Sequence, residues 1–276
     1  MSLEFEFQQQ FNPLNQQLLS SDATFSGSEM YESMIALEPL AKKIGSDSQE
    51  LLELYNALSL LQKKRGETED QITYSKAALA IQQIRNTLNI HDHLLLANRL
   101  MSALEENEEW EEAVFYSETV CNLSEQDPEL SQSQKIHLKQ QRGYLLHEVG
   151  QYQDAIKINL ATLDLAEKEF GENAEELISL LTNIAQNYYA LGNFVESEKI
   201  LTRALIIARE QQDDDQQFEM LFQLGVLAHE AGNPTLAKSR FMEYRELAET
   251  LDDEFYLEQA DNIMQEFAKR LANLTH

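Results

Sequence analysis

The feature that most constrains the fold is a pair of amphipathic segments joined at a glycine, residues 180–209. In the first segment apolar residues recur every three or four positions, the stripe of a helix packed on one side, at Leu181, Ile184, Ala185, Tyr188 and Leu191. Gly192 follows, and it ends the helix because the turn needs a residue that tolerates a positive φ angle. The returning segment carries Phe194, Ser197, Leu201 and Ala204. This stretch predicts a helical hairpin whose helices approach most closely at Ala185.

The same pattern recurs at a nearly constant spacing. Gly143 lies 42 residues before Ala185, and Gly225 lies 40 residues after it. Each of these copies has a glycine at its turn, Gly150 and Gly232. A fourth copy begins 42 residues before Gly143, at Met101, and has Glu108-Glu109 at its turn in place of glycine. A fifth, weak copy passes through Leu58, Gly66 and Ala78.

On these residues the chain resembles a tetratricopeptide repeat, a family whose signature is a spaced series of apolar, small, Tyr, Gly, aromatic, Ala, Phe and Ala positions. The stretch departs from it in having Ser197 for Ala and Leu201 for Phe, substitutions that are conservative in size. The repeat exceeds the roughly 34 residues usual for the family, so longer helices are expected. The resemblance covers about residues 50–250. It implies an all-α fold, a right-handed superhelical solenoid of helix-turn-helix repeats with a C-terminal capping helix.

Two parts of the chain are expected from the pattern, an N-terminal arm over residues 1–27 and a single solenoid over residues 28–276. The arm is rich in Gln and Ser and shows no sustained helical period, so part of it is expected to be disordered. A helix without an obvious partner is predicted from Ser28 to Gly45. About five helical pairs follow, at residues 48–88, 91–123, 129–170, 173–210 and 217–251. A last helix, residues 254–274, is expected to cap the stack and to bury Phe255.

The charge of the chain excludes several classes of partner. It has 48 acidic and 21 basic residues, a net charge of −27, so it repels phosphate backbones and anionic lipid. We therefore expect no nucleic-acid and no membrane binding, and a charged partner should be basic. The sequence has no apolar stretch of about 18 residues and no signal-peptide pattern, which predicts a cytoplasmic protein.

No arrangement of residues typical of catalysis is found. The sequence lacks a glycine-rich phosphate loop, histidines paired at helical spacing with a glutamate, and a Gly-x-Ser-x-Gly elbow. His147-Glu148 and His229-Glu230 are interpreted as exposed polar pairs, and the lone Cys121 as a small core residue. We expect no enzymatic activity, no cofactor and no metal.

An acidic segment, residues 105–112, surrounds the only tryptophan, Trp110, with six glutamates. Charge runs usually face water, so the first interpretation is a solvated turn with Trp110 packing on its own helix. The alternative is a contact for a basic partner in which Trp110 is the anchor.

The resemblance also implies a groove, because in this family the first helix of each pair faces the concave side. Applied here, it selects Asn98, Arg99, Gln140, Gln141, Tyr144, Asn183, Gln186, Tyr189, Phe222 and Gln223. Amide side chains offer both a donor and an acceptor, so they could hold an extended peptide by its backbone, with the aromatic rings forming apolar pockets. Asn183 resembles the groove asparagine of the longer-repeat members. The alternative is that any solvated concave face needs polar residues.

Arg99 is the only basic residue among these groove residues. Chaperone-binding members of the family hold a C-terminal carboxylate with several lysines and arginines, so that function is disfavoured here. The sequence predicts a non-enzymatic module that binds a protein or peptide, as an adaptor, a chaperone or an inhibitor of a basic partner. The alternatives are a peptide-sensing regulator that acts through another protein, and a self-associating scaffold that forms a homodimer.

Overall fold

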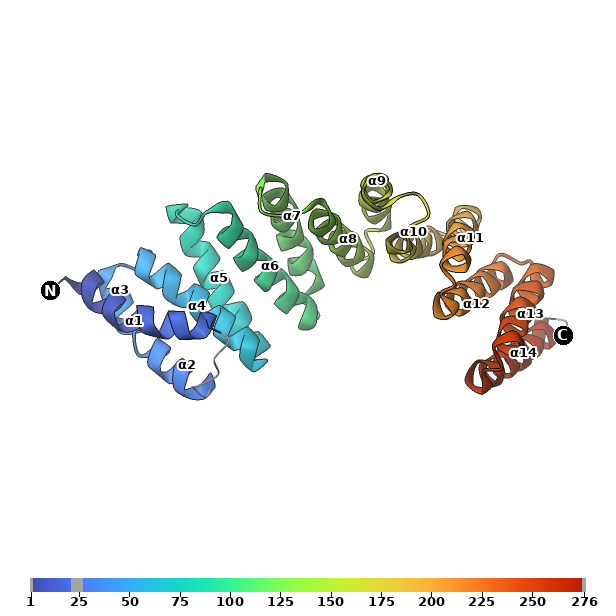
Figure 1. The fold of residues 1–276 in the computed structure, drawn as a ribbon, viewed down its shortest axis with the longest axis horizontal. Coiled ribbons are helices and arrows are strands. Elements are labelled where there is room, and N and C mark those ends of the chain that lie inside the picture. The colour runs from blue at the N-terminus through green and yellow to red at the C-terminus, as the bar shows by residue number, and fades with distance from the viewer. Residues whose placement is uncertain (1, 21–26, 275–276) are drawn as a thin grey trace. The chain divides into compact units, whose positions relative to one another are not determined.

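The computed structural model describes residues 2–20 and 27–274, and in these residues it contains helices and no strand (Figure 1). The all-α fold of consecutive packed helix pairs predicted from the sequence is confirmed. The chain forms two compact units, residues 1–145 and 146–276, and each is described by itself. The predicted boundary between an arm and a single solenoid stays a prediction.

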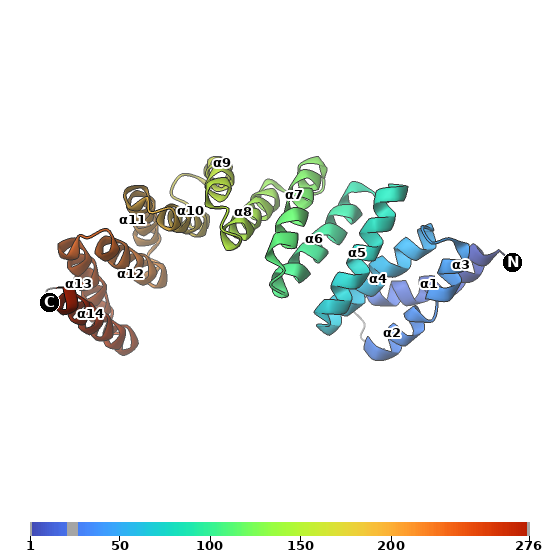
Figure 2. The same ribbon diagram turned by 180° about the vertical axis from the view of Figure 1, so that it is seen from behind.

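Unit 1 consists of three N-terminal helices and two hairpins, followed by most of α8. The N-terminal helices are α1 (Leu3–Leu19), α2 (Gly27–Ile35) and α3 (Glu38–Ile44). The hairpins are α4 (Gln49–Arg65) with α5 (Thr68–Arg85) and α6 (Ile90–Glu106) with α7 (Trp110–Gln126), and α8 spans Gln132–Glu148. Each hairpin is closely packed, and α5 also packs on α6, as both ribbon views show (Figures 1 and 2).

The described part of the N-terminal arm differs from the expectation, because residues 3–19 form α1. Phe7 and Phe11 are 0% and 1% exposed, and their rings stack with centroids 5.1 Å apart. The helix packs on α3 and α4, where the Gln8 amide donates to Glu53 Oε2 at 3.0 Å. The stripe Phe7, Phe11, Leu14 and Leu18 has helical spacing, but Pro13 and the glutamines around it obscure it. Residues 21–26 of the arm lie outside the described residues.

The predicted helix from Ser28 to Gly45 is two helices, α2 and α3. The break lies at residues 36–37, and Pro39 occupies the first turn of α3. Proline has no N–H and its ring clashes with the preceding turn, so one continuous helix is disfavoured there, whereas a first turn accepts it.

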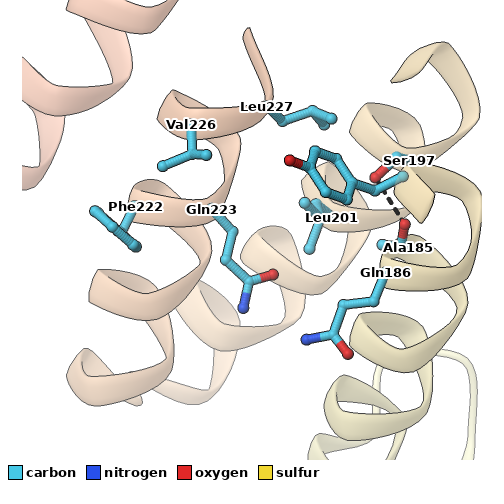
Figure 3. Close-up of a pocket in the computed structure, with 9 residues that line it drawn as sticks. Ala185, Gln186, Ser197, Leu201, Phe222, Gln223, Val226 and Leu227 are labelled. Carbon is cyan, nitrogen blue, oxygen red and sulfur yellow. Dashed lines mark hydrogen bonds between the residues drawn. The ribbon is translucent and has the colours of Figure 1, made fainter. Parts of the chain in front are cut away.

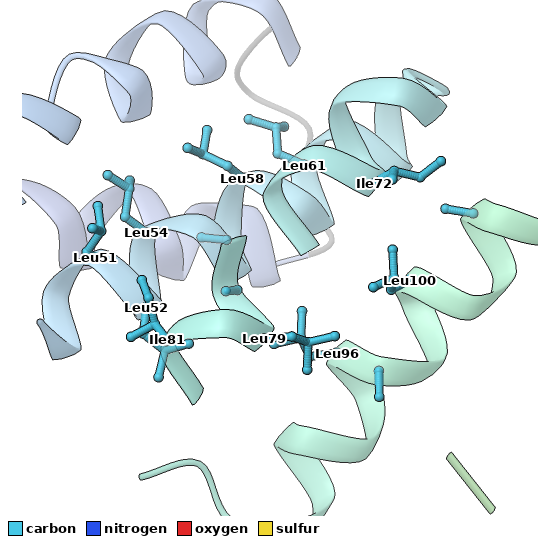
Figure 4. Close-up of a cluster of buried hydrophobic side chains, with 14 of the residues drawn as sticks. Leu51, Leu52, Leu54, Leu58, Leu61, Ile72, Leu79, Ile81, Leu96 and Leu100 are labelled. Carbon is cyan, nitrogen blue, oxygen red and sulfur yellow. The ribbon is translucent and has the colours of Figure 1, made fainter. Parts of the chain in front are cut away.

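The core of unit 1 is a leucine-rich layer between α4, α5 and α6. Its members are almost fully excluded from water (Figure 4), for example Leu52, Leu58, Leu79, Leu96 and Leu100. Burying a side chain of this size contributes about 1.5–3 kcal/mol. Leu18 of α1 belongs to the same buried cluster, so α1 extends this core.

Unit 2 repeats the hairpin twice. It contains α9 (Tyr152–Phe170), a short 3-10 turn (Glu175–Leu177), α10 (Ile178–Ala190), α11 (Phe194–Gln211), α12 (Asp214–Glu230), α13 (Pro234–Leu251) and α14 (Glu254–Leu274). The predicted turns are confirmed: Gly192 and Gly232 have φ angles of +72° and +76°. Asn193 and Asn233 each follow a turn glycine, and their side chains accept a backbone N–H of the next helix.

The small residues of the repeat lie where the paired helices touch, as predicted. Ala185 is 0% exposed on α10, and Ser197 Oγ of α11 donates to its carbonyl oxygen at 2.8 Å. Gly225 of α12 is buried against Phe241 of α13, and a methyl group in its place would lie 2.2 Å from the nearest ring atom. Ser197 therefore occupies a position at which the family has alanine, and its hydroxyl is satisfied by the hydrogen bond to the Ala185 carbonyl oxygen.

The helix α14 packs on α13, as expected of a terminal helix. Ala260 and Phe267 are 1% and 6% exposed, and Phe267 packs in one buried cluster with Phe241 and its neighbours. Phe255 is 63% exposed, so the prediction that it is buried is wrong. It lies in the first turn of the helix, and an apolar stripe read from sequence does not show where the partner surface ends.

Candidate functional site

An open cavity of about 280 Å³ lies between α10 and α12 of unit 2 (Figure 3). Four residues selected from the sequence line it, Gln186 and Tyr189 from α10 and Phe222 and Gln223 from α12. Leu201 of α11 also lines it. The structure thus brings together side chains that are up to 37 residues apart in sequence, in the arrangement expected of a groove.

The walls of this cavity are apolar and partly open to water. Tyr189 is 38% exposed and Phe222 is 39% exposed, high values for aromatic side chains. Ser197 also lines the cavity, but its hydroxyl is bonded to the Ala185 carbonyl. Tyr189 Oη donates to the Glu230 carboxylate, a hydrogen bond that raises the pKa of Tyr189 and orients its ring. The cavity can accept an apolar side chain.

The two carboxamides at the cavity have capacity left for a ligand. Among the described residues, no group forms a hydrogen bond with the Gln186 side chain, which is exposed. Gln223 Nε2 donates to Glu219 Oε1 at 2.5 Å, which leaves its carbonyl oxygen as an acceptor. Figure 3 shows both amides beside the apolar wall. They could meet the N–H and C=O groups of a peptide backbone.

Asn183 is half-buried on α10, but it does not line this cavity. Its backbone carbonyl oxygen accepts a hydrogen bond from Asn187 Nδ2 at 2.6 Å. Asn187 was not selected from the sequence; it is 0% exposed, and its Oδ1 lies 3.1 Å from His147 Nδ1. The sequence feature that could have identified Asn187 is an amide side chain one turn after Asn183, on the buried face of the helix. The role of Asn183 in binding stays a prediction.

The cavity continues along α12 toward α14. A second cavity of about 310 Å³ shares Phe222 and Val226 with the first and adds His229, Phe241 and Ile263. We call these two adjoining cavities together the α12 channel and define it by Gln186, Tyr189, Phe222, Gln223, Val226 and Ile263. Of the two side chains that line both cavities, Phe222 is the larger, so its ring is the main apolar surface where they join.

In unit 1 the selected arginine serves the packing of helices. Arg99 Nη1 donates to the Asn56 carbonyl and to Asn56 Oδ1 at 3.0 Å, and to Ser59 Oγ at 3.2 Å. Burial lowers the pKa of Arg99 to about 10. Gln71 Nε2 in turn donates to the Arg99 carbonyl at 3.0 Å. These contacts join α6 to α4 and α5. Because they engage the Arg99 guanidinium, they agree with the inference that the groove lacks a set of basic residues for a C-terminal carboxylate.

The other selected residues of unit 1 are divided between internal contacts and a cavity. Gln141 donates to Glu105 Oε2 at 2.7 Å, and Gln140 and Tyr144 also have interaction partners. Asn98 lines an open cavity of about 410 Å³ between α6 and α8, and its buried Oδ1 has no hydrogen-bond partner in the described structure. Unit 1 therefore contains a separate concave surface with one unused acceptor.

The acidic segment is a turn in which half of the glutamates are engaged internally. Lys76 Nζ lies 2.6 Å from Glu112 and 3.8 Å from Glu109, and Glu105 accepts from Gln141. The Trp110 ring makes an edge contact with Tyr144, with centroids 6.4 Å apart, and it packs against the core of unit 1. This geometry favours the packing interpretation of Trp110.

The described part of the chain offers neither a metal site nor an exposed thiol. Within that part, no group of three His, Cys, Asp or Glu side chains could hold a metal ion. Cys121 is buried, burial raises its pKa, and its thiol faces the Leu138 carbonyl at 3.7 Å, as expected of a core residue. In the residues described, no helix is both long and apolar enough to span a membrane.

Comparison with known families and structures supports the repeat assignment. The family model of the tetratricopeptide repeat matches residues 135–210 and 176–250. No match was found among curated proteins. Among solved structures, the chain is similar to BtubC from P. vanneervenii (16% identity, TM-score 0.58, covering 87% of this chain and 92% of that one).

Two further structures show the same fold. The apo form of RapI aligns at 15% identity with a TM-score of 0.64, covering 89% of this chain and 69% of that one. YrrB aligns at 14% identity with a TM-score of 0.51, covering 84% of this chain and 99% of that one. YrrB is a tetratricopeptide-repeat protein with an unusual peptide-binding site.

Proposed function

We propose that this protein binds an extended peptide segment of a partner protein in the α12 channel, because residues 135–250 match the tetratricopeptide repeat, a fold of protein-interaction modules. The main support is the cavity between α10 and α12, where the Gln186 and Gln223 amides keep hydrogen-bonding capacity next to the exposed rings of Tyr189 and Phe222. The amides bind the peptide backbone and the rings accept an apolar side chain of the peptide.

The proposed binding mode would cover the exposed aromatic rings of Tyr189 and Phe222. Exposed aromatic rings that line one cavity are unfavourable in water, and apolar patches of this kind usually mark interaction sites. Covering Phe222 and Tyr189 with an apolar side chain removes that cost, at about 25 cal/mol per Å² of apolar area buried. YrrB, whose fold is similar, has a peptide-binding site, and this supports a ligand of the same kind.

The physiological role belongs to the same proposal. An adaptor, a chaperone and an inhibitor all require the binding step, and the net charge of −27 favours a basic partner for each of them. The basic partner is protein rather than nucleic acid, since a phosphate backbone is repelled. Self-association as a homodimer is the alternative, and sedimentation equilibrium of the full chain distinguishes a dimer from a monomer.

The test uses 12-residue peptides selected by phage display against the full chain, with affinities then measured by calorimetry. Removing the amides in Gln186→Ala with Gln223→Ala should weaken binding by about 1–3 kcal/mol, because peptide groups are left unpaired. Gln265→Ala is the matched control, since this exposed glutamine of α14 does not line the channel. Unchanged binding in the double variant, with loss of binding in Trp110→Ala, would place the interface at the acidic turn instead.

A further inference from the structure

A third open cavity, of about 570 Å³, lies between α12, α13 and the first half of α14. Five of the ten residues that line it are aromatic, Phe218, Phe222, Tyr244, Phe255 and Tyr256. Two more are carboxylates, Asp215 and Glu219, and none is basic. Aromatic rings and carboxylates around one space are the combination that binds an organic cation, because ring faces and carboxylates both present negative charge.

The aromatic side chains form a fixed wall. Phe218 and Tyr256 stack with centroids 3.7 Å apart and an interplanar angle of 16°, and Tyr244 packs on Phe218 at 4.8 Å. Tyr256 Oη donates to Asp215 Oδ1 at 2.6 Å, which holds the ring against α12. Phe255 makes an edge contact with Tyr256 at 5.2 Å and stays 63% exposed. The rings are therefore positioned before any ligand arrives, and Phe255 lies open to water.

The carboxylates of this cavity lack a cation within the described structure. Asp215 accepts from Tyr256 and Glu219 accepts from Gln223, both uncharged donors, and neither carboxylate forms an ion pair with a described residue. The basic side chain next in sequence to the wall, Arg245, is paired with Glu249 and Asp261, each at 2.9 Å. Two negative charges near aromatic rings are thus available to a positive group from outside.

The lack of basic residues at this cavity extends to α10 and α12, the two helices that line the first cavity of the α12 channel. The helices α10 and α12 contain no lysine or arginine. The basic residues of the unit are on α9, α11 and α13 and at the end of α14, where several form ion pairs such as Arg203 with Glu167 and Arg240 with Glu243. Positive charge is therefore concentrated on the second helix of each hairpin. The carboxylates of Asp215 and Glu219 on α12 have no basic partner among the described residues.

We propose that this cavity, lined by Asp215, Glu219, Phe222, Phe255 and Tyr256, binds a lysine or arginine side chain of a partner protein. The positive group lies next to the Phe255 ring face and within ion-pair distance of Glu219. The alkyl part of the side chain covers Phe222, as long basic side chains do on apolar surfaces. This is a specific site for a basic residue, distinct from general attraction by the net charge.

The local potential agrees with this assignment. The pKa of Tyr244 is raised to about 12 by burial, together with the charges of Glu219 and Asp253. The pKa of Tyr256 is also raised to about 12, first by its hydrogen bond to Asp215 and then by burial. A bound cation would offset part of the negative potential that the carboxylates create at these phenols.

The site adjoins the α12 channel through Phe222, but it does not depend on the proposed peptide-backbone contacts. If the channel holds a peptide, the cavity sets a requirement for a basic residue beside the apolar residue that covers Phe222. If the channel holds none, the cavity still binds a basic side chain from a partner surface. The test therefore uses a ligand too short to fill the channel.

The experiment is a titration of the ¹⁵N-labelled full chain with the capped tripeptide acetyl-Gly-Arg-Gly-amide, followed by NMR. Its lysine counterpart and its citrulline counterpart, which keeps the shape of arginine without the charge, are titrated in parallel. Saturable shifts are expected at the amides of Phe218, Glu219 and Tyr256 with the charged peptides, and none with citrulline. The stronger of the two charged peptides identifies the preferred cation. Equal shifts with citrulline would overturn the proposal.

Three variants separate the site from general charge attraction. Glu219→Gln should weaken binding about three- to fivefold, since a partly exposed ion pair contributes up to about 1 kcal/mol, which is about fivefold when 1.4 kcal/mol is tenfold. Glu246→Gln removes the same charge from the exposed surface of α13 and should change binding less than about twofold. Phe255→Leu should weaken binding about two- to fivefold through loss of the cation–π contact. Equal effects of Glu219→Gln and Glu246→Gln would refute a specific site.

Discussion

Replacing Gly225 by alanine tests the contact between α12 and α13 at Phe241. The added methyl carbon would lie 2.2, 2.6 and 2.7 Å from three atoms of the Phe241 ring, whereas ordinary contact begins at 3.4 Å. The ring would have to withdraw by about 1.2 Å, and it is 4% exposed and packed against Phe267 with centroids 5.3 Å apart. Overpacking of this kind costs about 1–3 kcal/mol.

Helix propensity acts in the opposite direction, so the sign of the change in unfolding free energy shows which effect is larger. Alanine is favoured over glycine inside a helix by about 1 kcal/mol, and Gly225 lies in the middle of α12. We expect Gly225→Ala to destabilise the protein by up to about 2 kcal/mol net, because the clash exceeds the gain in propensity. In a Phe241→Leu background the ring is absent, so the same substitution should stabilise by up to about 1 kcal/mol.

The assay is urea denaturation followed by far-ultraviolet circular dichroism for the parent, both single variants and the double variant. The four free energies of unfolding form a double-mutant cycle, and the coupling between the two positions should be about 1–3 kcal/mol, the cost of the clash. If Gly225→Ala raises the midpoint in the parent background, or if the two effects simply add, Phe241 does not fill the space next to Gly225. The assignment of the α12 and α13 faces would then be incorrect.

Three further predictions concern other contacts. Ala185→Leu should cost about 1–3 kcal/mol by overpacking a fully buried position, and an unchanged denaturation midpoint would contradict the packing seen at α11. Glu108→Gly should stabilise the protein by up to about 1 kcal/mol, because Glu108 has a φ angle of +59° that glycine adopts without strain; a lower thermal midpoint would argue against this. The hydrogen bond to Asp127 raises the pKa of His91, so its stabilisation is complete below a pH of about 6.5 and is lost as the pH rises through the raised value. The difference in unfolding free energy between parent and His91→Gln should therefore be larger at a pH of about 5.5 than at about 9, and a difference that does not depend on pH would exclude this linkage.

The sequence alone was sufficient for the hairpins, because their signals are local. An apolar stripe and a turn residue specify a helix end within a few positions, so α14 spans the predicted residues 254–274. The same holds for the turn at Gly192, which has the positive φ angle that its position requires. The failures have local causes too. Pro13 and its glutamines concealed α1, and Pro39 divided a predicted helix in two.

The candidate site was partly predictable. The rule that first helices face a groove placed Gln186, Tyr189, Phe222 and Gln223 together, and they line one cavity. Arg99 obeys the same rule in sequence but is bonded to Asn56, because a long side chain can reach a neighbouring helix that the pattern does not specify. Position on a helix face is a local property, whereas the atom that a side chain contacts depends on which helices are adjacent.

Tertiary structure alone decided where charge and aromatic surface meet. The sequence shows that α12 has Asp215, Glu219 and Phe222 on one face, at helical spacing. It does not show that Phe255, forty residues after Asp215, is exposed next to them, or that Arg240 and Arg245 of α13 pair with other carboxylates. Periodicity within a helix is determined by backbone geometry and can be read from a linear chain. Which rings and carboxylates share one cavity depends on the packing of three helices, and that follows only from the three-dimensional fit of their side chains.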